Sequence, residues 1–156
     1  NSIKPEAVSY GVAKKAGWLS YYQPGKAGMR IPAIKLKELV DHLKKTLQIS
    51  KLRVIGDMNQ VCETIAVLPG APGGQRQVGV VETERPDVLI AGELREWETA
   101  EYIRDARALG SKTALIILGH AVSEEPGMEW LVDWLNPLLP GINITHIASG
   151  DPFTWI

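Results

Sequence analysis

The sequence has little cysteine, no long apolar run and no excess of positive charge. Its single cysteine, Cys62, cannot form an internal disulfide, which fits a protein kept in a reducing compartment. No apolar run approaches the roughly 20 residues that cross a bilayer. The first residues also lack the apolar segment of a secretory signal. We therefore expect a cytoplasmic protein with neither a membrane span nor a disulfide framework.

The charges nearly balance, with 17 Lys and Arg residues against 18 Asp and Glu residues and a net charge of −1. Because no basic surplus is available to neutralise a phosphate backbone, nucleic-acid binding is not expected. A length of 156 residues suffices for one core, so we expect residues 1–156 to form one domain or a fragment of a larger one. The chain begins at Asn1 rather than methionine, so we expect either processing or further residues upstream.

Short β-rich runs alternate with helical patterns from Leu52 onward. We expect strands at 52–55, 64–68, 87–91, 113–118 and 142–148, and helices at 5–16, 35–47, 75–84, 98–109 and 126–135. The valines at 75–84 leave a strand open there. Residues 21–34, which are rich in proline and glycine, are expected to form a loop. The alternation predicts an α/β fold of layered strands and helices.

Three of the expected strands end in glycine-rich or polar steps. These are the loop at 69–74, the pair Gly92-Glu93 and the pair Gly119-His120. Open α/β sheets bind ligands just beyond the carboxyl ends of their strands, so three successive steps predict one shared rim. The loop would let backbone amides approach an anion, but it lacks both nucleotide-binding fingerprints, and a tight turn is the favoured interpretation.

His120 and Glu124 are candidate metal ligands. They stand four residues apart, with His120 at a strand end and Glu124 expected in the first turn of a following helix. Imidazole and carboxylate together suit zinc, manganese or iron(II). The alternative is a surface pair without function, and the spacing alone favours that alternative. The position beyond a strand end is what supports the metal interpretation.

An acidic group, Glu93, Glu96 and Glu98, follows the strand at 87–91. It would hold a cation or supply a general base. For Glu98 the favoured alternative is a first-turn residue stabilised by the helix dipole, whereas the role of Glu93 stays open. His42 is expected on the solvated side of the helix at 35–47, and Cys62 is expected to be a small buried residue.

Four segments occur in an order that is typical of one protein family. They are Arg53-Val54-Ile55-Gly56-Asp57, Ile65-Ala66-Val67-Leu68-Pro69-Gly70, Asp87-Val88-Leu89-Ile90-Ala91-Gly92-Glu93 and, most specific, Gly119-His120-Ala121-Val122-Ser123-Glu124. In these segments the chain resembles the NGG-one-interacting-factor-three-like (NIF-three-like) family, also described as dinuclear metal-centre proteins and GTP cyclohydrolase I type 2 homologues. The resemblance covers nearly the whole chain, but only the C-terminal half of a typical member.

The resemblance implies two similar α/β halves per protein and a homo-oligomeric, hexameric ring. It also implies a site for two divalent metal ions, in which His120 and Glu124 are ligands. The earlier ligand motifs of the family, a His-His pair and a His-Thr-x-x-Asp-like motif, are not found in this chain. Two adjacent histidines that line the family site correspond here to Glu96 and Trp97.

Two functions follow as hypotheses. The first is a metal-dependent, hydrolase-like protein acting on an unidentified small molecule, with His120 and Glu124 as ligands and Glu93 as general base or as a hydrogen-bond acceptor for a ligand. The second is a non-enzymatic ring that holds partners, with a structural metal or none. An open coordination position would distinguish a catalytic from a structural metal.

The helix expected at 126–135 carries two kinds of large apolar residue. Met128, Leu131, Val132 and Leu135 form one stripe, which we expect to face the core. Trp130 and Trp134 are spaced i, i+4 and share another face. Burial within the monomer and burial between subunits are both open for the two tryptophans, and the ring assembly of the family favours an intersubunit contact.

Overall fold

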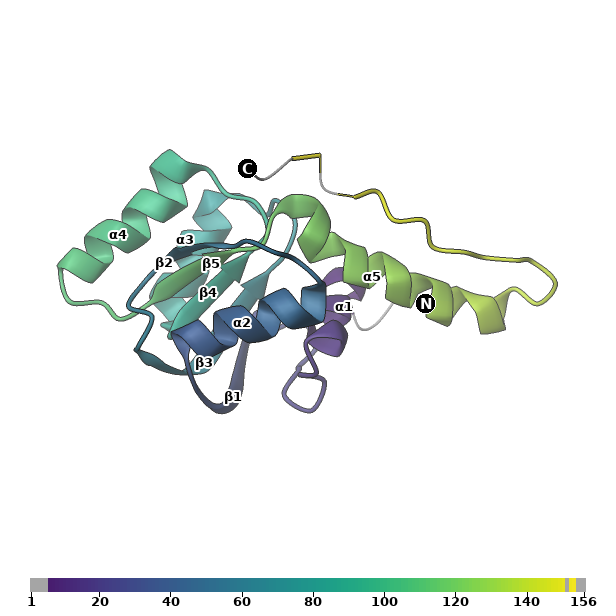
Figure 1. The fold of residues 1–156 in the computed structure, drawn as a ribbon, viewed down its shortest axis with the longest axis horizontal. Coiled ribbons are helices and arrows are strands. Elements are labelled where there is room, and N and C mark those ends of the chain that lie inside the picture. The colour runs from purple at the N-terminus through teal and green to yellow at the C-terminus, as the bar shows by residue number, and fades with distance from the viewer. Residues whose placement is uncertain (1–5, 151, 154–156) are drawn as a thin grey trace.

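Five strands form one mixed sheet in the computed structural model, which describes residues 6–150 and 152–153 (Figure 1). The central strands β3, β4 and β5 are parallel, whereas β1 and β2 pair antiparallel at the two edges. The sheet confirms the expected α/β class. The strands, in the spatial order β1-β3-β4-β5-β2, are β1 (Gly28–Lys35), β2 (Arg53–Ile55), β3 (Val61–Leu68), β4 (Val88–Ala91) and β5 (Ala114–Ile117).

Helices cover both faces of the sheet. One core cluster joins side chains of α1 and α2 to one face, and a second joins side chains of α3 and α4 to the other. Successive residues of β4 alternate between the two clusters, which explains why the central strands are apolar throughout. The helices are α1 (Ala7–Lys15), α2 (Leu36–Leu47), α3 (Gly74–Glu84), a π-helix η1 (Glu96–Ala100) that leads into α4 (Glu101–Ala108), α5 (His120–Leu135) and the 3-10 helix η2 (Asn136–Leu138).

The prediction of a loop at 21–34 is wrong for its second half, because Gly28–Lys35 forms β1. Pro32 argued against a strand there, since proline cannot donate to a ladder. However, β1 lies at the edge of the sheet, and its register against β3 shifts between Arg30 and Ile34. Pro32 therefore falls within an irregular stretch of an edge strand, which tolerates proline.

Helix α5 begins at His120 and not near Pro126 as expected, so Glu124 lies in the second turn rather than the first. A proline inside a helix removes one hydrogen bond and crowds the preceding turn. Here Pro126 and Gly127 are buried where α5 packs on α1. The packing of α5 on α1 therefore compensates for Pro126, which by itself favours a break in the helix.

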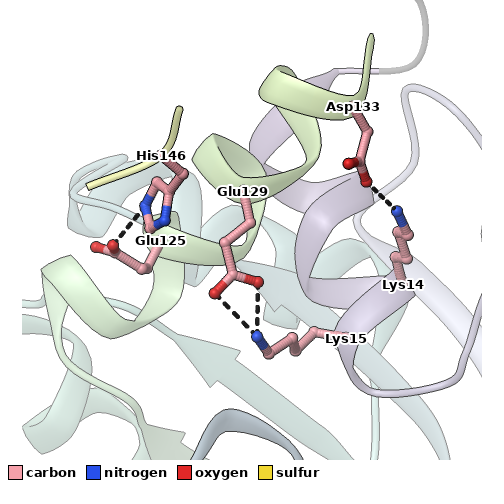
Figure 2. Close-up of polar contacts among 6 residues, drawn as sticks. All are labelled: Lys14, Lys15, Glu125, Glu129, Asp133 and His146. Carbon is pink, nitrogen blue, oxygen red and sulfur yellow. Dashed lines mark hydrogen bonds and ion pairs between the residues drawn. The ribbon is translucent and has the colours of Figure 1, made fainter. Parts of the chain in front are cut away.

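The α1–α5 contact is a close approach of two helix backbones. A Cβ on Gly11 of α1 would lie 2.3 Å from the backbone nitrogen of Gly127, so the two glycines permit the approach. Ion pairs line its border, with Lys14 Nζ 2.8 Å from Asp133 and Lys15 Nζ 2.6 Å from Glu129 (Figure 2). These pairs are half-exposed and add little, so the fit of the backbones is the main interaction.

The expectation that the stripe of α5 faces the core is wrong; its residues are Met128, Leu131, Val132 and Leu135. None of the four is among the buried residues of α5, and Met128 is 40% exposed. Helix α5 extends beyond the sheet and meets α1 instead (Figure 1). The face towards α1 includes Trp130, whose ring lies 4.8 Å from that of Tyr10 and 6.5 Å from that of Trp134.

Two further expectations fail. Residues 142–148, expected as a strand, form neither helix nor strand and run back along α5 (Figure 1). Their alternation of isoleucine with polar residues imitates a strand, but no strand in the described chain pairs with them. The helical spacing at 98–109 would turn Leu109 towards the core with Ile103, but Leu109 follows the end of α4 and is 90% exposed. Among the described helices, none has the length and apolarity to cross a membrane.

Candidate metal site

The carboxyl ends of β3, β4 and β5 meet at one rim, as parallel neighbours must. Backbone hydrogen bonds continue beyond the strands and join the three loops. The Glu93 amide donates to the Gly70 carbonyl at 2.8 Å, and the Gly119 amide donates to the Gly92 carbonyl at 3.0 Å. The hydrogen bonds between the loops therefore fix the backbone from which the side chains of the rim project. A site with precise geometry needs such support.

Glycines allow the loops to approach each other closely. A Cβ on Gly92 would lie 2.3 Å from Ser123 Oγ and 2.5 Å from the Gly70 nitrogen. Gly70 has a φ of 65°, and its Cβ would lie 2.3 Å from Glu124 Oε1. The loop at 69–74 thus packs directly against the Glu124 side chain, and any larger residue at Gly70 or Gly92 would push the loops apart.

His120 lies between two carboxylates. Its Nδ1 is 2.9 Å from Glu93 Oε2, and its Nε2 is 3.3 Å from Glu124 Oε2. Glu93 reaches it from the end of β4, and Glu124 from one turn further along α5. The imidazole is 46% exposed, so it is accessible to solvent and to a ligand. The structure brings together all three residues that the sequence singled out.

The two carboxylates define the chemistry of the ring. The hydrogen bond to Glu93, and then the charges of Glu124 and Glu93, raise the pKa of His120 above its ordinary value, against the opposing effect of burial. In the neutral ring, a proton on Nδ1 is donated to Glu93. The lone pair of Nε2 then points to the side of Glu124. This tautomer is the one a metal at Nε2 would require.

Buried polar residues that the sequence did not single out support the site. Ser123 Oγ accepts the Gly70 amide at 2.9 Å and donates to the His120 carbonyl at 2.7 Å, tying the start of α5 to the loop. Gln77 Nε2 donates to the Glu93 carbonyl at 2.8 Å, and Thr99 Oγ1 donates to Gln77 at 2.6 Å. Ser123, Gln77 and Thr99 are fully buried. In the sequence, the signal that could have identified Gln77 is a polar residue on the side of the helix at 75–84 that faces the core.

The rest of the acidic group lies elsewhere. Glu96 pairs with Arg53 of β2, and Glu98 Oε2 lies 3.8 Å from Arg95 and beside Gly74 at the start of α3. Trp97 is 71% exposed. Of the acidic group, only Glu93 contacts His120.

The donor set gives a partial fit to a metal ion. His120 Nε2 and Glu124 Oε2 lie 3.3 Å apart, but no cluster of three or more His, Cys, Asp or Glu residues is arranged for a metal within residues 6–150 and 152–153. A zinc ion takes three protein ligands in catalytic sites and four in structural sites. The two side chains therefore supply fewer donors than such a site needs.

The other two histidines have structural roles. His42, expected in solvent, is half-buried: its Nε2 lies 2.8 Å from the Ala16 carbonyl and its ring stacks on Trp18. His146 Nε2 lies 2.6 Å from Glu125 and fastens the C-terminal segment to α5 (Figure 2). Cys62 is fully buried, as expected, and burial raises the pKa of its thiol.

Two cavities meet at Glu124. The first, which we call the α1–α3 cavity, has a volume of about 280 Å³ and includes Lys26, Arg76 and Glu124 in its lining. The second, which we call the His120 cavity, has a volume of about 370 Å³. It has mainly apolar walls, among them Ile117 and Val122, and both His120 and Glu124 line it. A small molecule therefore has access to Glu124 from two sides and to His120 from one.

The fold is similar to that of several solved structures. The protein ybgI, of unknown function, aligns with a TM-score of 0.73 and 21% identity over 96% of this chain and 58% of that chain. A Bacillus cereus protein related to NIF3 aligns at 0.60 and 18% over 83% of this chain and 35% of that chain. The Staphylococcus aureus hypothetical protein SA1388 aligns at 0.60 and 24%, with coverages of 83% and 36%. This chain thus spans between about a third and three fifths of their lengths. No curated protein matches the sequence.

A family model gives the assignment that these structural similarities alone do not. The model of Duf34/NIF3 (NGG1p interacting factor 3) matches residues 14–152, which include every residue of the rim described above. The match confirms the resemblance seen in the four sequence segments. The chain belongs to the Duf34/NIF3 family.

Proposed function

We propose that this chain contributes half of a divalent-metal site in a hydrolase-like protein, with His120 Nε2 and a Glu124 oxygen as ligands. The observation that supports this is the line of contacts from Glu93 through His120 to Glu124, at 2.9 and 3.3 Å. Metal-bound histidines regularly donate their other ring proton to a carboxylate, which fixes the tautomer and makes the ligating nitrogen more basic. In this proposal Glu93 is the carboxylate that accepts that proton.

Glu93 is a positioning residue in this proposal. Its Oε2 accepts the Nδ1 proton of His120, and Gln77 holds its backbone. The role of general base, also predicted from the sequence, would compete with the imidazole for that oxygen. The suitable ions are zinc, manganese and iron(II). Such an ion, when bound, lowers the pKa of a coordinated water and polarises a substrate oxygen.

The remaining ligands come, in this proposal, from another segment of a full-length family member or from a neighbouring subunit of a homo-oligomeric ring in the cytoplasm. Two donors are too few to hold zinc tightly. This chain on its own therefore binds metal weakly, and a complete site with two ions needs the additional segment.

Calorimetric titration with zinc and with manganese tests the proposal. His120→Ala and Glu124→Gln should abolish measurable binding, and Glu93→Gln should weaken it by about 10–100-fold. His146→Ala is the matched control, because it removes a histidine that also pairs with a glutamate of α5 (Figure 2). Zinc binding that is unchanged in His120→Ala would contradict the proposal. Tight binding of two ions by this chain would show that further ligands lie within it.

A further inference from the structure

The α1–α3 cavity is lined by two cations whose side chains have no partner among the residues that the structure describes. Lys26 lies in the segment before β1, and Arg76 lies in the first turn of α3. Throughout the described residues, neither side chain has an ion pair or a hydrogen bond. By contrast, Arg53, on the wall of the His120 cavity, is paired with Glu96. Of the two cavities that meet at Glu124, the α1–α3 cavity is therefore the one whose described lining includes unpaired cations.

The acidic residues of the same cavity are already engaged. Both oxygens of Glu6 accept backbone amides of α1, from Val8 and Ser9, each at 2.9 Å. Glu124 turns Oε2 towards His120 Nε2 at 3.3 Å. Neither carboxylate is within ion-pair distance of Lys26 or Arg76. An anion that enters the cavity would therefore find both cations available.

The cavity also offers a neutral donor. Burial, followed by the nearby Glu6 and Tyr10, raises the pKa of Tyr22 above its ordinary value, so its hydroxyl keeps its proton at neutral pH. The hydroxyl can donate a hydrogen bond to an oxygen of a ligand. A guanidinium, an ammonium and a phenol together match an anion with several oxygens, since arginine binds phosphate with two parallel hydrogen bonds.

We propose that the α1–α3 cavity is the phosphate subsite of the candidate metal site, and that the substrate is a small organic phosphate. Its phosphate group contacts Lys26 and Arg76, and its reacting end lies at Glu124. The inference rests on the proposed function for the second part, since Glu124 is there a metal ligand. The cavity of about 280 Å³ suits a small ligand, and the apolar His120 cavity beyond Glu124 accepts the organic part.

The test is calorimetric titration of the whole 156-residue chain with inorganic phosphate and with phenyl phosphate, in a chelating buffer without metal. We expect saturable binding of one ligand, with phenyl phosphate the tighter of the two and acetate weaker than both. Lys26→Gln and Arg76→Gln should each weaken binding by about tenfold. Lys45→Gln is the control, because Lys45 is an exposed cation of α2 away from both cavities, and it should leave binding unchanged.

Two results would overturn the subsite: no saturable binding of phosphate, or binding that persists in the Lys26→Gln/Arg76→Gln double variant with a folded circular dichroism spectrum. The double variant should bind zinc as the unmodified chain does. If the unmodified chain binds phosphate but no zinc, the proposed function and the link to Glu124 are contradicted. The anion subsite itself would then stand. The two failures are therefore distinguishable.

Discussion

Replacing Gly11 by alanine should destabilise the protein through the α1–α5 contact. The added Cβ would lie 2.3 Å from the Gly127 nitrogen and 2.4 Å from the carbonyl carbon and oxygen of Pro126. Carbon atoms pack at about 3.5–4.0 Å, so the overlap exceeds 1 Å. All three nearest atoms belong to the backbone, which cannot rotate away as a side chain would. One helix has to move relative to the other.

The size of the effect follows from two opposing terms. Alanine in place of glycine inside a helix stabilises it by about 0.5–1 kcal/mol. Overpacking of a close contact costs typically about 1–3 kcal/mol and occasionally more. Because the helix-propensity gain offsets part of the overpacking cost, we expect Gly11→Ala to lose about 0.5–2 kcal/mol net, against the 5–15 kcal/mol that is typical of a small domain.

Gly79→Ala in α3 is the matched control. Gly79 also lies within a helix, but a Cβ there meets nothing within 4 Å, so only the helix-propensity term remains. It should raise stability by about 0.5–1 kcal/mol. Urea unfolding monitored by tryptophan fluorescence should show the two midpoints moving in opposite directions at an unchanged m-value. If Gly11→Ala proves as stable as Gly79→Ala, the helices do not pack as described.

Three other outcomes are expected. Zinc affinity at His120 should increase as pH rises through the raised pKa of its imidazole, because protons compete with metal for the ring, and a pH-independent affinity would exclude His120 as a ligand. Asp87 is partly buried, yet amide and hydroxyl hydrogen bonds from residues 63 and 64 lower the pKa of its carboxyl. The stabilisation by the Asp87 carboxylate is therefore present above pH of about 4 and lost as pH falls through the lowered pKa. In urea titrations, Asp87→Asn should lower the free energy of unfolding by about 1–2 kcal/mol at pH 7 and leave it unchanged at low pH. Replacing Trp130 and Trp134 by serine should yield a smaller species by light scattering with a folded circular dichroism spectrum, and a monomeric unmodified chain would contradict an intersubunit role.

The sequence was informative where one periodicity decided the outcome. The stripe Leu36, Leu39, Val40, Leu43 and Leu47 is buried throughout in α2, and the apolar runs at 88–91 and 114–117 are two of the three central strands. The rim followed from these strands, because parallel neighbours bring their carboxyl ends together. The placing of Glu93, His120 and Glu124 on one rim was therefore predictable.

The failures share a cause, which is that a position in space decided what the local sequence left open. Pro32 excludes a central strand but not an irregular edge strand, and the edge position of β1 is a property of the sheet. Pro126 is tolerated in α5 because α1 packs on it. The contact of Glu93 with Nδ1 of His120, and the support from Gln77, depend on how the loops meet. Residue spacing carries no information on these contacts.

The two edges of the sheet have consequences for how this protein associates. An exposed strand edge is a template on which another chain can add a strand, and natural proteins block such edges. At one edge, β1 carries Pro32 and a shift of register, and at the other, β2 is only three residues long and bears the charged Arg53. Both edges are therefore poor templates for strand addition, which protects the folded chain against edge-to-edge aggregation. Copies of this protein that associate are therefore expected to do so through surfaces other than the two sheet edges.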